Sequence, residues 1–271
     1  MLNKLLKYEF RATGRMFLPA YGLLIVMAVI QRIMIELNIY SSQNISVNIL
    51  SVIIPAIFVS AIVAVFVITL VAMIDRFYKN LLGREGYLMF TLPVSVAQLM
   101  WSKIVVVVIW SILSLVAGIL AFLIVFSEPQ FFNQFFYELR MFTSKLNGLG
   151  TGNVIAYSIE AIIFMISSLV AFVFMIYLCL SIGQLSDKHK GLCAFGAFIG
   201  INIVLNNIIA AILSGIFRHI DLGGIDNLIS SMTYIGQIHV SILTGILAMV
   251  IQAAIYFLVT RYILTNKLNL E

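Results

Sequence analysis

Charged residues are scarce in this sequence. Asp, Glu, Lys and Arg make up 10% of its 271 residues, whereas apolar residues make up 62%. Soluble globular domains are about 25% charged and about 45–50% apolar. The composition therefore excludes a soluble enzyme, and it excludes a disordered chain, which needs low hydrophobicity and high charge. It indicates a protein that spans a membrane several times.

Groups and motifs that mark catalysis are also few. The two cysteines, Cys179 and Cys193, lie in apolar runs without a metal or redox spacing. The sequence contains neither G-x-x-x-x-G-K-[ST] nor G-x-G-x-x-G, the loops that cradle nucleotide phosphates. His219, Asp221 and Asp226 are too scattered on a Gly-rich segment to predict a metal site. We therefore expect no enzyme activity, no catalytic residue, no metal and no cofactor bound by this chain, and no nucleotide-binding domain.

Long apolar runs dominate what is present. A membrane-spanning helix needs about 20 mostly apolar residues, and it must be helical because lipid offers the backbone no hydrogen-bond partner. The predicted spans are residues 16–36, 49–74, 104–126, 154–185, 192–217 and 238–264. The sequence thus predicts an all-α membrane protein with six transmembrane helices in a single domain, residues 1–271.

Lys and Arg fall mainly on one side of these spans. Twelve of the sixteen precede the first span, lie between spans two and three or four and five, or end span six. The opposite side holds only Arg32, Arg140, Lys145 and Arg218. Because cytoplasmic loops carry the excess of Lys and Arg, we expect both termini to be cytoplasmic. The same bias explains the net charge of +5 without nucleic-acid binding.

The first fifteen residues predict an amphipathic interfacial helix. Lys7, Arg11 and Arg15 continue a basic stripe from Lys4 at helical spacing, and such a stripe faces anionic headgroups of membrane lipid. Glu9 lies on the apolar half, where a carboxylate needs a partner. Two interpretations stay open: a Glu at a frayed helix end, or a contact with a cytoplasmic neighbour.

A second amphipathic helix is predicted on the opposite side of the membrane. It begins near Pro129 and stops at Gly148. Its apolar residues recur at helical spacing, and they are Phe131, Phe135, Leu139, Phe142 and Leu146. The helix is interpreted either as a structural cover or as a substrate gate on the outer leaflet.

Polar groups inside the spans are nearly all uncharged. Glu160, near the outer end of span four, is the one charged residue placed within a span, which argues against an ion-coupled pump. Uncharged polar residues that form either interhelical hydrogen bonds or a substrate path are Ser60, Thr69, Asn202 and Asn206. Gly196 and Gly200 form a G-x-x-x-G pair, which favours close helix packing within the chain or with a second chain.

The segment between spans two and three carries the most specific pattern. Gly83 and Gly86 allow a bend, residues 87–92 predict a short helix along the inner surface, and Pro93 ends it. Ser95 with Gln98 forms a capping box that starts the next helix. Aromatic residues and Met concentrate in residues 87–90, which predicts an exposed protein-docking site.

This segment resembles a known family. The run Glu85-Gly86-x-Leu88-x-x-Thr91-Leu92-Pro93-Val94-Ser95, followed by Leu99 and Lys103, resembles the first coupling helix of type-2 ATP-binding-cassette (ABC) permeases. The opening Leu5-Leu6-Lys7-Tyr8-Glu9-Phe10-Arg11 resembles small exporter permeases of Gram-positive bacteria. The resemblance covers the six-span layout, the amphipathic start and this segment. The long outer segment between spans three and four departs from the family pattern.

The resemblance implies a division of labour between subunits. A separate cytoplasmic ABC ATPase would bind ATP and Mg and dock on the segment between spans two and three, on residues 187–190 and near the N-terminus, and a second permease chain would complete a homo- or heterodimer. Residues 218–236 would form a re-entrant outer element. The docking residues expected are Glu9, Arg84, Glu85, Gly86, Tyr87, Leu88, Phe90, Pro93, Asp187 and Lys188.

The function expected from the resemblance is transport across the bacterial plasma membrane. The chain would be the permease subunit of an ATP-driven exporter of a hydrophobic or amphipathic substrate, such as an antimicrobial peptide or a drug, and so confer antimicrobial peptide resistance. One alternative is a non-transporting membrane regulator or assembly factor that docks an ATPase. A channel or ion-coupled carrier is the third hypothesis, and the scarcity of buried charge counts against it.

Overall fold

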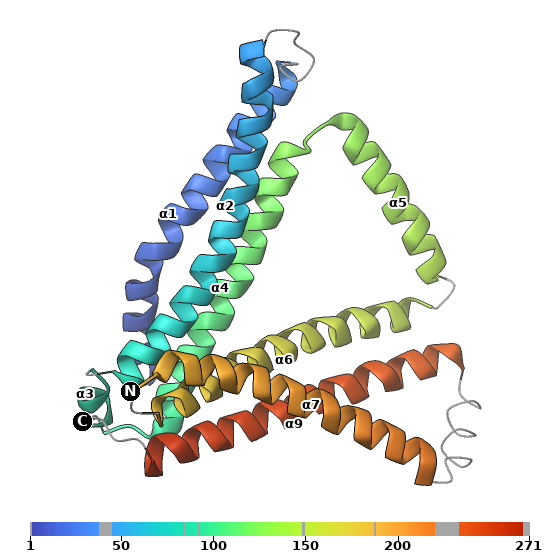
Figure 1. The fold of residues 1–271 in the computed structure, drawn as a ribbon. Helices are drawn as coiled ribbons and strands as arrows, with labels where there is room; N and C mark the ends of the chain where they lie inside the picture. The colour runs from blue at the N-terminus through green and yellow to red at the C-terminus, as the bar shows by residue number, and fades with distance from the viewer. Residues whose placement is uncertain are drawn as a thin grey trace. The chain divides into compact units, whose positions relative to one another are not determined.

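The computed structural model describes residues 2–37, 45–83, 85–91, 93–147, 150–186, 188–219 and 233–267. The regular elements of these residues are all helices and none is a strand, which confirms the all-α part of the predicted fold class. The elements in chain order (Figure 1) are α1 (Leu2–Glu36), α2 (Ile45–Phe77), the π-helix η2 (Tyr78–Leu82), α3 (Glu85–Phe90), α4 (Val96–Val125), α5 (Pro129–Asn147), α6 (Thr151–Gln184), α7 (Lys190–His219) and α9 (Tyr234–Asn266).

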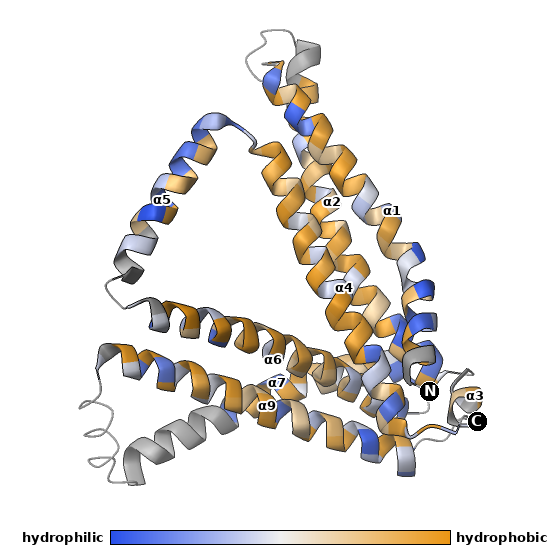
Figure 2. Cartoon of the chain, turned by 180° about the vertical axis from the view of Figure 1, so that it is seen from behind, coloured by the Kyte–Doolittle hydropathy of each residue, from blue (hydrophilic) through white to orange (hydrophobic). Residues whose placement is uncertain are grey.

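Five helices of the described residues are long and apolar enough to cross a membrane. The apolar stretches are Leu5–Glu36, Ile49–Leu82, Val96–Val125, Gly152–Gln184 and Ile235–Asn266. Figure 2 shows apolar residues covering most of α2, α4 and α6. By length and composition the chain is thus a multi-pass membrane protein. The predicted span 192–217 lies in α7, whose described apolar stretch, Lys190–Leu205, is shorter, so a sixth span stays a prediction.

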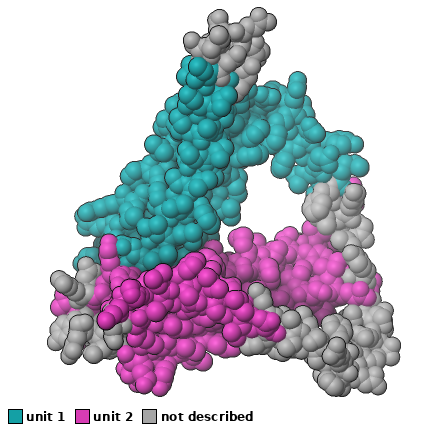
Figure 3. Space-filling view, viewed as in Figure 1, with its two compact units in different colours: residues 1–76, 97–143 teal, residues 77–96, 144–271 magenta. Residues whose placement is uncertain are grey.

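The chain divides into two compact units, coloured separately in Figure 3. Unit 1 contains residues 1–76 and 97–143, and unit 2 contains residues 77–96 and 144–271. Each unit has its own helix packing.

Unit 1 packs α1, α2 and α4 around small residues. One core cluster consists of Leu24, Ala28, Phe58, Ala61, Val65, Ala117, Ala121 and Val125. Alanines from all three helices let the backbones approach closely, which is how membrane helices gain van der Waals contact without a hydrophobic driving force. A second cluster forms around Phe17 and Trp110, whose rings stack with centroids 4.5 Å apart.

Two helices run farther than the sequence pattern predicted. The N-terminal segment is no separate interfacial helix, because α1 continues through it into the first span with Pro19 inside. Its 35 residues extend over about 50 Å, more than the roughly 30 Å of a bilayer core, so the basic turns reach beyond the apolar layer. A break was expected from Asp75, but α2 continues to Phe77 and then into η2. The continued helix buries Phe77 and Leu81.

The predicted amphipathic helix is present as α5, Pro129–Asn147. It belongs to unit 1 up to residue 143, and Phe131 contacts Phe126 of the preceding turn with ring centroids 5.6 Å apart. Phe135 and Leu139 are largely exposed on it, which fits a helix that borders lipid. Gly148 and the side chains of Phe142 and Leu146 lie outside the described residues.

Unit 2 packs α6 along both α9 and α7. Rings of Phe174 and Phe257 meet between α6 and α9 in a T-shaped arrangement, with centroids 5.4 Å apart. Beside the turn of the α6–α7 hairpin the backbones approach closely: a Cβ on Gly183 would lie 2.6 Å from the carbonyl oxygen of Lys190 and 2.6 Å from Cβ of Ala194. The close approach of α6 and α7 therefore requires a residue without a side chain at Gly183.

The G-x-x-x-G pair behaves differently. A Cβ added at Gly196 or Gly200 would meet nothing within 4 Å, so neither glycine mediates a close helix contact within the described part of the chain. Of the two contacts left open for this pair, the described residues show no close one within the chain, and contact with a second chain stays a prediction.

We expect Gly183→Ala to destabilise the α6–α7 hairpin. A new methyl group would overlap backbone and Ala194, and overpacking of this kind costs about 1–3 kcal/mol. The matched control is Gly191→Ala in α7, where a Cβ meets nothing within 4 Å and the loss of backbone freedom favours Ala by about 0.5–1 kcal/mol. Thermal unfolding in detergent should give a lower midpoint for Gly183→Ala only. Equal midpoints for the two variants would contradict the close approach.

Candidate functional site

The short helix α3 is the element that the sequence pattern marked for docking. It occupies Glu85–Phe90, close to the predicted range 87–92, and α4 begins at Val96 directly after the predicted cap Ser95. The bend before α3 depends on Gly83: its N–H donates to the carbonyl oxygen of Tyr78 over 2.8 Å, and an added Cβ would lie 2.9 Å from the carbonyl oxygen of Lys79. A side chain at this position would open the turn.

The base of α3 is anchored in unit 2 through η2. η2 packs against both α3 and α6. Next to it, the ring of Phe77 stacks on Tyr177 of α6 with centroids 3.9 Å apart, and the side-chain amide of Gln184 donates to the carbonyl oxygen of Leu82 over 3.1 Å. The stacked rings and this part-buried hydrogen bond from a side chain to the backbone hold η2 in place. α3 is therefore a supported projection and not a loose loop.

The exposed surface of this projection is apolar at its centre. Leu88 is 68% exposed, Pro93 is also exposed, and the hydroxyl of Thr91 donates to the carbonyl oxygen of Leu88 over 2.8 Å, closing the last turn. Gly86 is buried, and it supports the bend, where its N–H donates to the carbonyl oxygen of Gly83 over 2.9 Å; its part in docking stays a prediction. Arg84 and the side chains of Glu85, Tyr87 and Phe90 lie outside the described residues.

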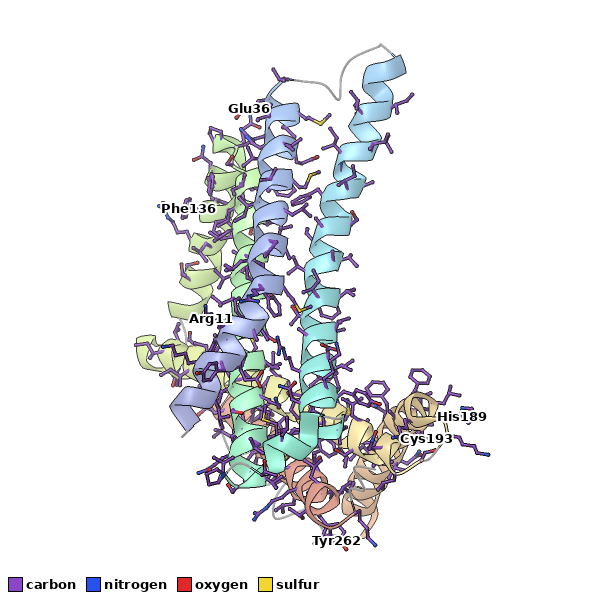
Figure 4. All side chains as sticks on the ribbon, turned by 90° about the vertical axis from the view of Figure 1, so that its left-hand side faces the viewer. Arg11, Glu36, Phe136, His189, Cys193 and Tyr262 are labelled. Carbon is purple, nitrogen blue, oxygen red and sulfur yellow. The ribbon has the colours of Figure 1, made fainter. Side chains whose placement is uncertain are left out.

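The turn between α6 and α7 offers the second expected inner surface. Lys188 and His189 are exposed, and Figure 4 shows His189 and Cys193 projecting outward there. Leu192 adds an exposed apolar side chain. Asp187 lies outside the described residues.

Glu9 finds its partner inside the chain. Its carboxylate lies 2.7 Å from Nζ of Lys103 on α4, and the two side chains are 10% and 2% exposed. Neither interpretation from the sequence named this intrachain partner, which gives Glu9 a structural role. A docking role for Glu9 stays a prediction. The sequence predicted Lys103 only as one of the cytoplasmic charges. Its pairing with Glu9 was not predicted.

A polar and aromatic ladder continues from this ion pair along α1. The indole N–H of Trp110 donates to Oγ1 of Thr13 over 2.7 Å, and that hydroxyl donates to the carbonyl oxygen of Glu9 over 2.8 Å. Phe17 stacks on Trp110, as described above, one turn farther on. A cavity of about 10 Å³ lies beside the ladder, with Arg76 in its wall; this is room for about one water molecule.

The residues considered for a substrate path are mostly bonded within the chain. Thr69 lies 3.0 Å from the hydroxyl of Ser114, which lies 2.8 Å from that of Tyr21, so the three hydroxyls link α2, α4 and α1. Ser60 donates to the carbonyl oxygen of Ile57. Asn202 donates to the carbonyl oxygen of Phe198 and contacts Sδ of Met175 on α6. The interhelical interpretation is thus confirmed for Thr69, and the side chain of Asn206 lies outside the described residues.

Unit 2 contains a second ionisable pair. Nδ1 of His239 on α9 lies 2.8 Å from Oε1 of Glu160 on α6. The ring of Tyr157 stacks on His239 with centroids 4.1 Å apart, and its hydroxyl donates to the carbonyl oxygen of Ile235 over 2.8 Å. Glu160 was recognised from the sequence as a charge within a span, but its partner, 79 residues away, was not.

Comparison of the chain with protein-family models, with curated proteins and with solved structures finds no match. The functional argument therefore depends on the geometry of α3, the two ion pairs and the helix packing.

We expect the Glu9–Lys103 pair to be strongly coupled in stability. Lys103→Met removes the ammonium group from a buried carboxylate, and the loss of one partner of a buried ion pair costs about 3–5 kcal/mol, whereas replacing both charges by apolar groups of similar volume is often neutral. The double variant Glu9→Leu/Lys103→Met should therefore recover most of the stability lost by either single change. Unfolding by denaturing detergent in micelles measures these free energies.

The matched control for this cycle is Lys7→Met, which removes an exposed lysine of the same helix. It should change the free energy of unfolding by less than about 0.5 kcal/mol. If the losses of the two single variants simply added in the double variant, the two side chains would not be interacting.

Proposed function

We propose that the chain is the membrane-spanning permease subunit of an ATP-driven ABC exporter. In this proposal a separate cytoplasmic ATPase binds and hydrolyses ATP, and the chain moves a hydrophobic or amphipathic substrate, such as an antimicrobial peptide or a drug. The protein lies in the bacterial plasma membrane with both termini cytoplasmic, and a second permease chain completes the pathway.

One observation supports this proposal most directly. A six-residue helix, α3, stands between two membrane spans with Leu88 exposed at its centre and its base held by η2 against α6. A connecting loop needs no such support. Binding energy at protein interfaces is concentrated in a few central, well-packed side chains, and the exposed Leu88 is placed to be one of them. A supported projection can also pass a push from a partner to the helices behind it.

The regulator hypothesis remains the second candidate, and hydrogen bonding supports it. Thr69 and Asn202 are bonded to their own chain, so these residues offer a substrate few unsatisfied polar groups. Reconstitution distinguishes the two functions: liposomes that contain the chain and its ATPase should move an amphipathic peptide or drug when MgATP is added, whereas a regulator would leave the probe in place.

Leu88→Asp should abolish co-purification of the ATPase. A carboxylate placed in an apolar contact loses the burial energy and adds a desolvation cost, so retention of the ATPase should fall by tenfold or more, about 1.4 kcal/mol. The measurement is the amount of a Walker-motif ATPase, identified by mass spectrometry, that remains on the tagged chain purified from its own cells, together with MgATP hydrolysis by the complex.

The matched control is Leu139→Asp on α5, a Leu that is 43% exposed and belongs to the opposite side of the membrane in this proposal. It should leave ATPase retention unchanged, and both variants should elute from size exclusion like the unmodified chain. Full retention of the ATPase by Leu88→Asp would refute docking at α3.

A further inference from the structure

The outward face of α1 carries three basic side chains in a row. Lys7, Arg11 and Arg15 are all exposed and follow one another at four-residue steps. They therefore lie on one face of the helix, with about 6 Å between successive residues along its axis. The opposite face, which carries Glu9 and Phe17, packs against α4, so the packing of unit 1 turns this basic row (Lys7, Arg11 and Arg15) away from the chain.

The basic row has no acidic partner among the residues that the structure describes. No ion pair or hydrogen bond involves the side chains of Lys7, Arg11 or Arg15 within this part of the chain. Glu9, the acidic residue of the same turns, is taken by Lys103 over 2.7 Å. The row thus presents three positive charges to an anion from outside the chain.

The length of the apolar part of α1 sets the depth of the basic row in the membrane. Residues 16–36 extend over about 31 Å, which matches the roughly 30 Å of the hydrocarbon core of a bilayer. Arg15 then lies at the boundary of the core, Arg11 about 6 Å beyond it and Lys7 about 12 Å beyond it. Because the head-group layer is about 5–8 Å thick on each side, the two arginines lie at the level of the lipid phosphates.

Pro19 supports the same depth. Proline has no N–H, so α1 supplies no i+4 donor for the carbonyl oxygen of Arg15. The hydrocarbon core offers no donor either, and an unpaired backbone group is costly there. Head groups and the water around them supply the donor that this carbonyl oxygen needs. The backbone at Arg15 therefore favours the head-group level, as its guanidinium does.

Beyond Arg15 the same face of α1 is apolar and exposed. Leu18, Val26 and Val29 are 67%, 57% and 43% exposed, and they continue the direction of the basic row at helical spacing. Figure 2 shows hydrophilic residues at the N-terminal end of α1 and apolar residues after them. The face thus presents positive charge and then an apolar surface. An acidic phospholipid matches both parts, whereas an acidic peptide would match only the first.

We propose that this face of α1 binds an acidic phospholipid, with its phosphate between Arg11 and Arg15 and an acyl chain along Leu18 and Val26. The planar fork of an arginine fits a phosphate with two hydrogen bonds, and Lys7 adds attraction from farther away. Such a site differs from a general attraction to a charged membrane surface, because it requires the two arginines and the acyl chains together. It goes beyond the proposed exporter function, since binding requires neither ATP nor a partner protein.

Native mass spectrometry of the purified full chain in detergent tests the site. The probes are phosphatidylglycerol and phosphatidylcholine with identical acyl chains, each titrated to equilibrium. Because each Lys or Arg near an anionic head group contributes about fivefold in affinity, we expect the first phosphatidylglycerol to bind about tenfold or more tighter than phosphatidylcholine. Glycerol 3-phosphate, which carries the phosphate without acyl chains, should not displace it at equal concentration.

The double variant Arg11→Gln/Arg15→Gln should remove the preference for phosphatidylglycerol. The matched control is Arg261→Gln/Lys267→Gln, which removes two exposed basic residues of α9 that are six positions apart and so do not share a helix face. It loses the same charge and should keep the preference. Both double variants change exposed side chains and should elute from size exclusion like the unmodified chain.

Photolabelling locates the bound lipid. Phosphatidylglycerol with a diazirine in its acyl chain should label the segment 16–29 of α1 saturably, in competition with unlabelled phosphatidylglycerol, and the label should be identified by mass spectrometry of peptides. The same probe should lose saturable labelling of this segment in Arg11→Gln/Arg15→Gln and keep it in the control variant.

Four results would overturn the proposal. Equal affinity for the two lipids would show that the phosphate charge is not recognised. Equal losses in the two double variants would show that net charge, and not the basic row, selects the lipid. Saturable labelling outside α1 alone would place the site elsewhere, and displacement by glycerol 3-phosphate would show a site for a free anion. Because the ATPase is absent from these experiments, none of these results bears on docking at α3.

Discussion

The contact between the Glu9 carboxylate and the Lys103 ammonium constrains the rest of unit 1. Two opposite charges with almost no access to solvent are tolerable only while they stay paired, so rotation or sliding of α1 against α4 at this level would break the pair at an energetic cost. The bond from Trp110 to Thr13 and the stacking of Phe17 on Trp110 follow from the same alignment. The charge at Glu9, unfavourable by itself in an apolar helix face, thereby sets which face of α1 meets α4.

Farther along α1, α2 and α4 from this ion pair, small side chains and a few hydrogen bonds are enough to pack unit 1. Small residues such as Ala28, Ala61 and Ala121 allow close approach, and the hydroxyls of Tyr21, Ser114 and Thr69 join the three helices. In lipid such bonds contribute modestly, about 0.6–2 kcal/mol each. They therefore reinforce an arrangement whose alignment the buried ion pair determines, and their hydroxyls are occupied by one another rather than presented to a passing substrate.

The sequence predicts those features that depend on local physics. Hydropathy and the obligation to form helices in lipid locate the five apolar helices, the Pro129 start of α5 and the Ser95 start of α4 within a few residues. Side-chain pairing across the fold is different: Glu9 and Lys103 are 94 positions apart, and no periodicity reveals which helix faces which. For the same reason the sequence does not reveal which glycine lies at a close helix contact. The G-x-x-x-G pattern points to Gly196 and Gly200, whereas the structure has the close contact at Gly183.

The distribution of these contacts also bears on how a push at α3 would travel in the proposed transporter. Residues 77–96, which include η2 and α3, belong to unit 2 but lie in the chain between two parts of unit 1. Stacking of Phe77 on Tyr177 and the bond from Gln184 to Leu82 couple this segment to α6, and α4 follows it directly. Within unit 1 the Glu9–Lys103 pair joins α4 to α1, and within unit 2 the Glu160–His239 pair joins α6 to α9, so in each unit the helices that share an ion pair would tend to move together.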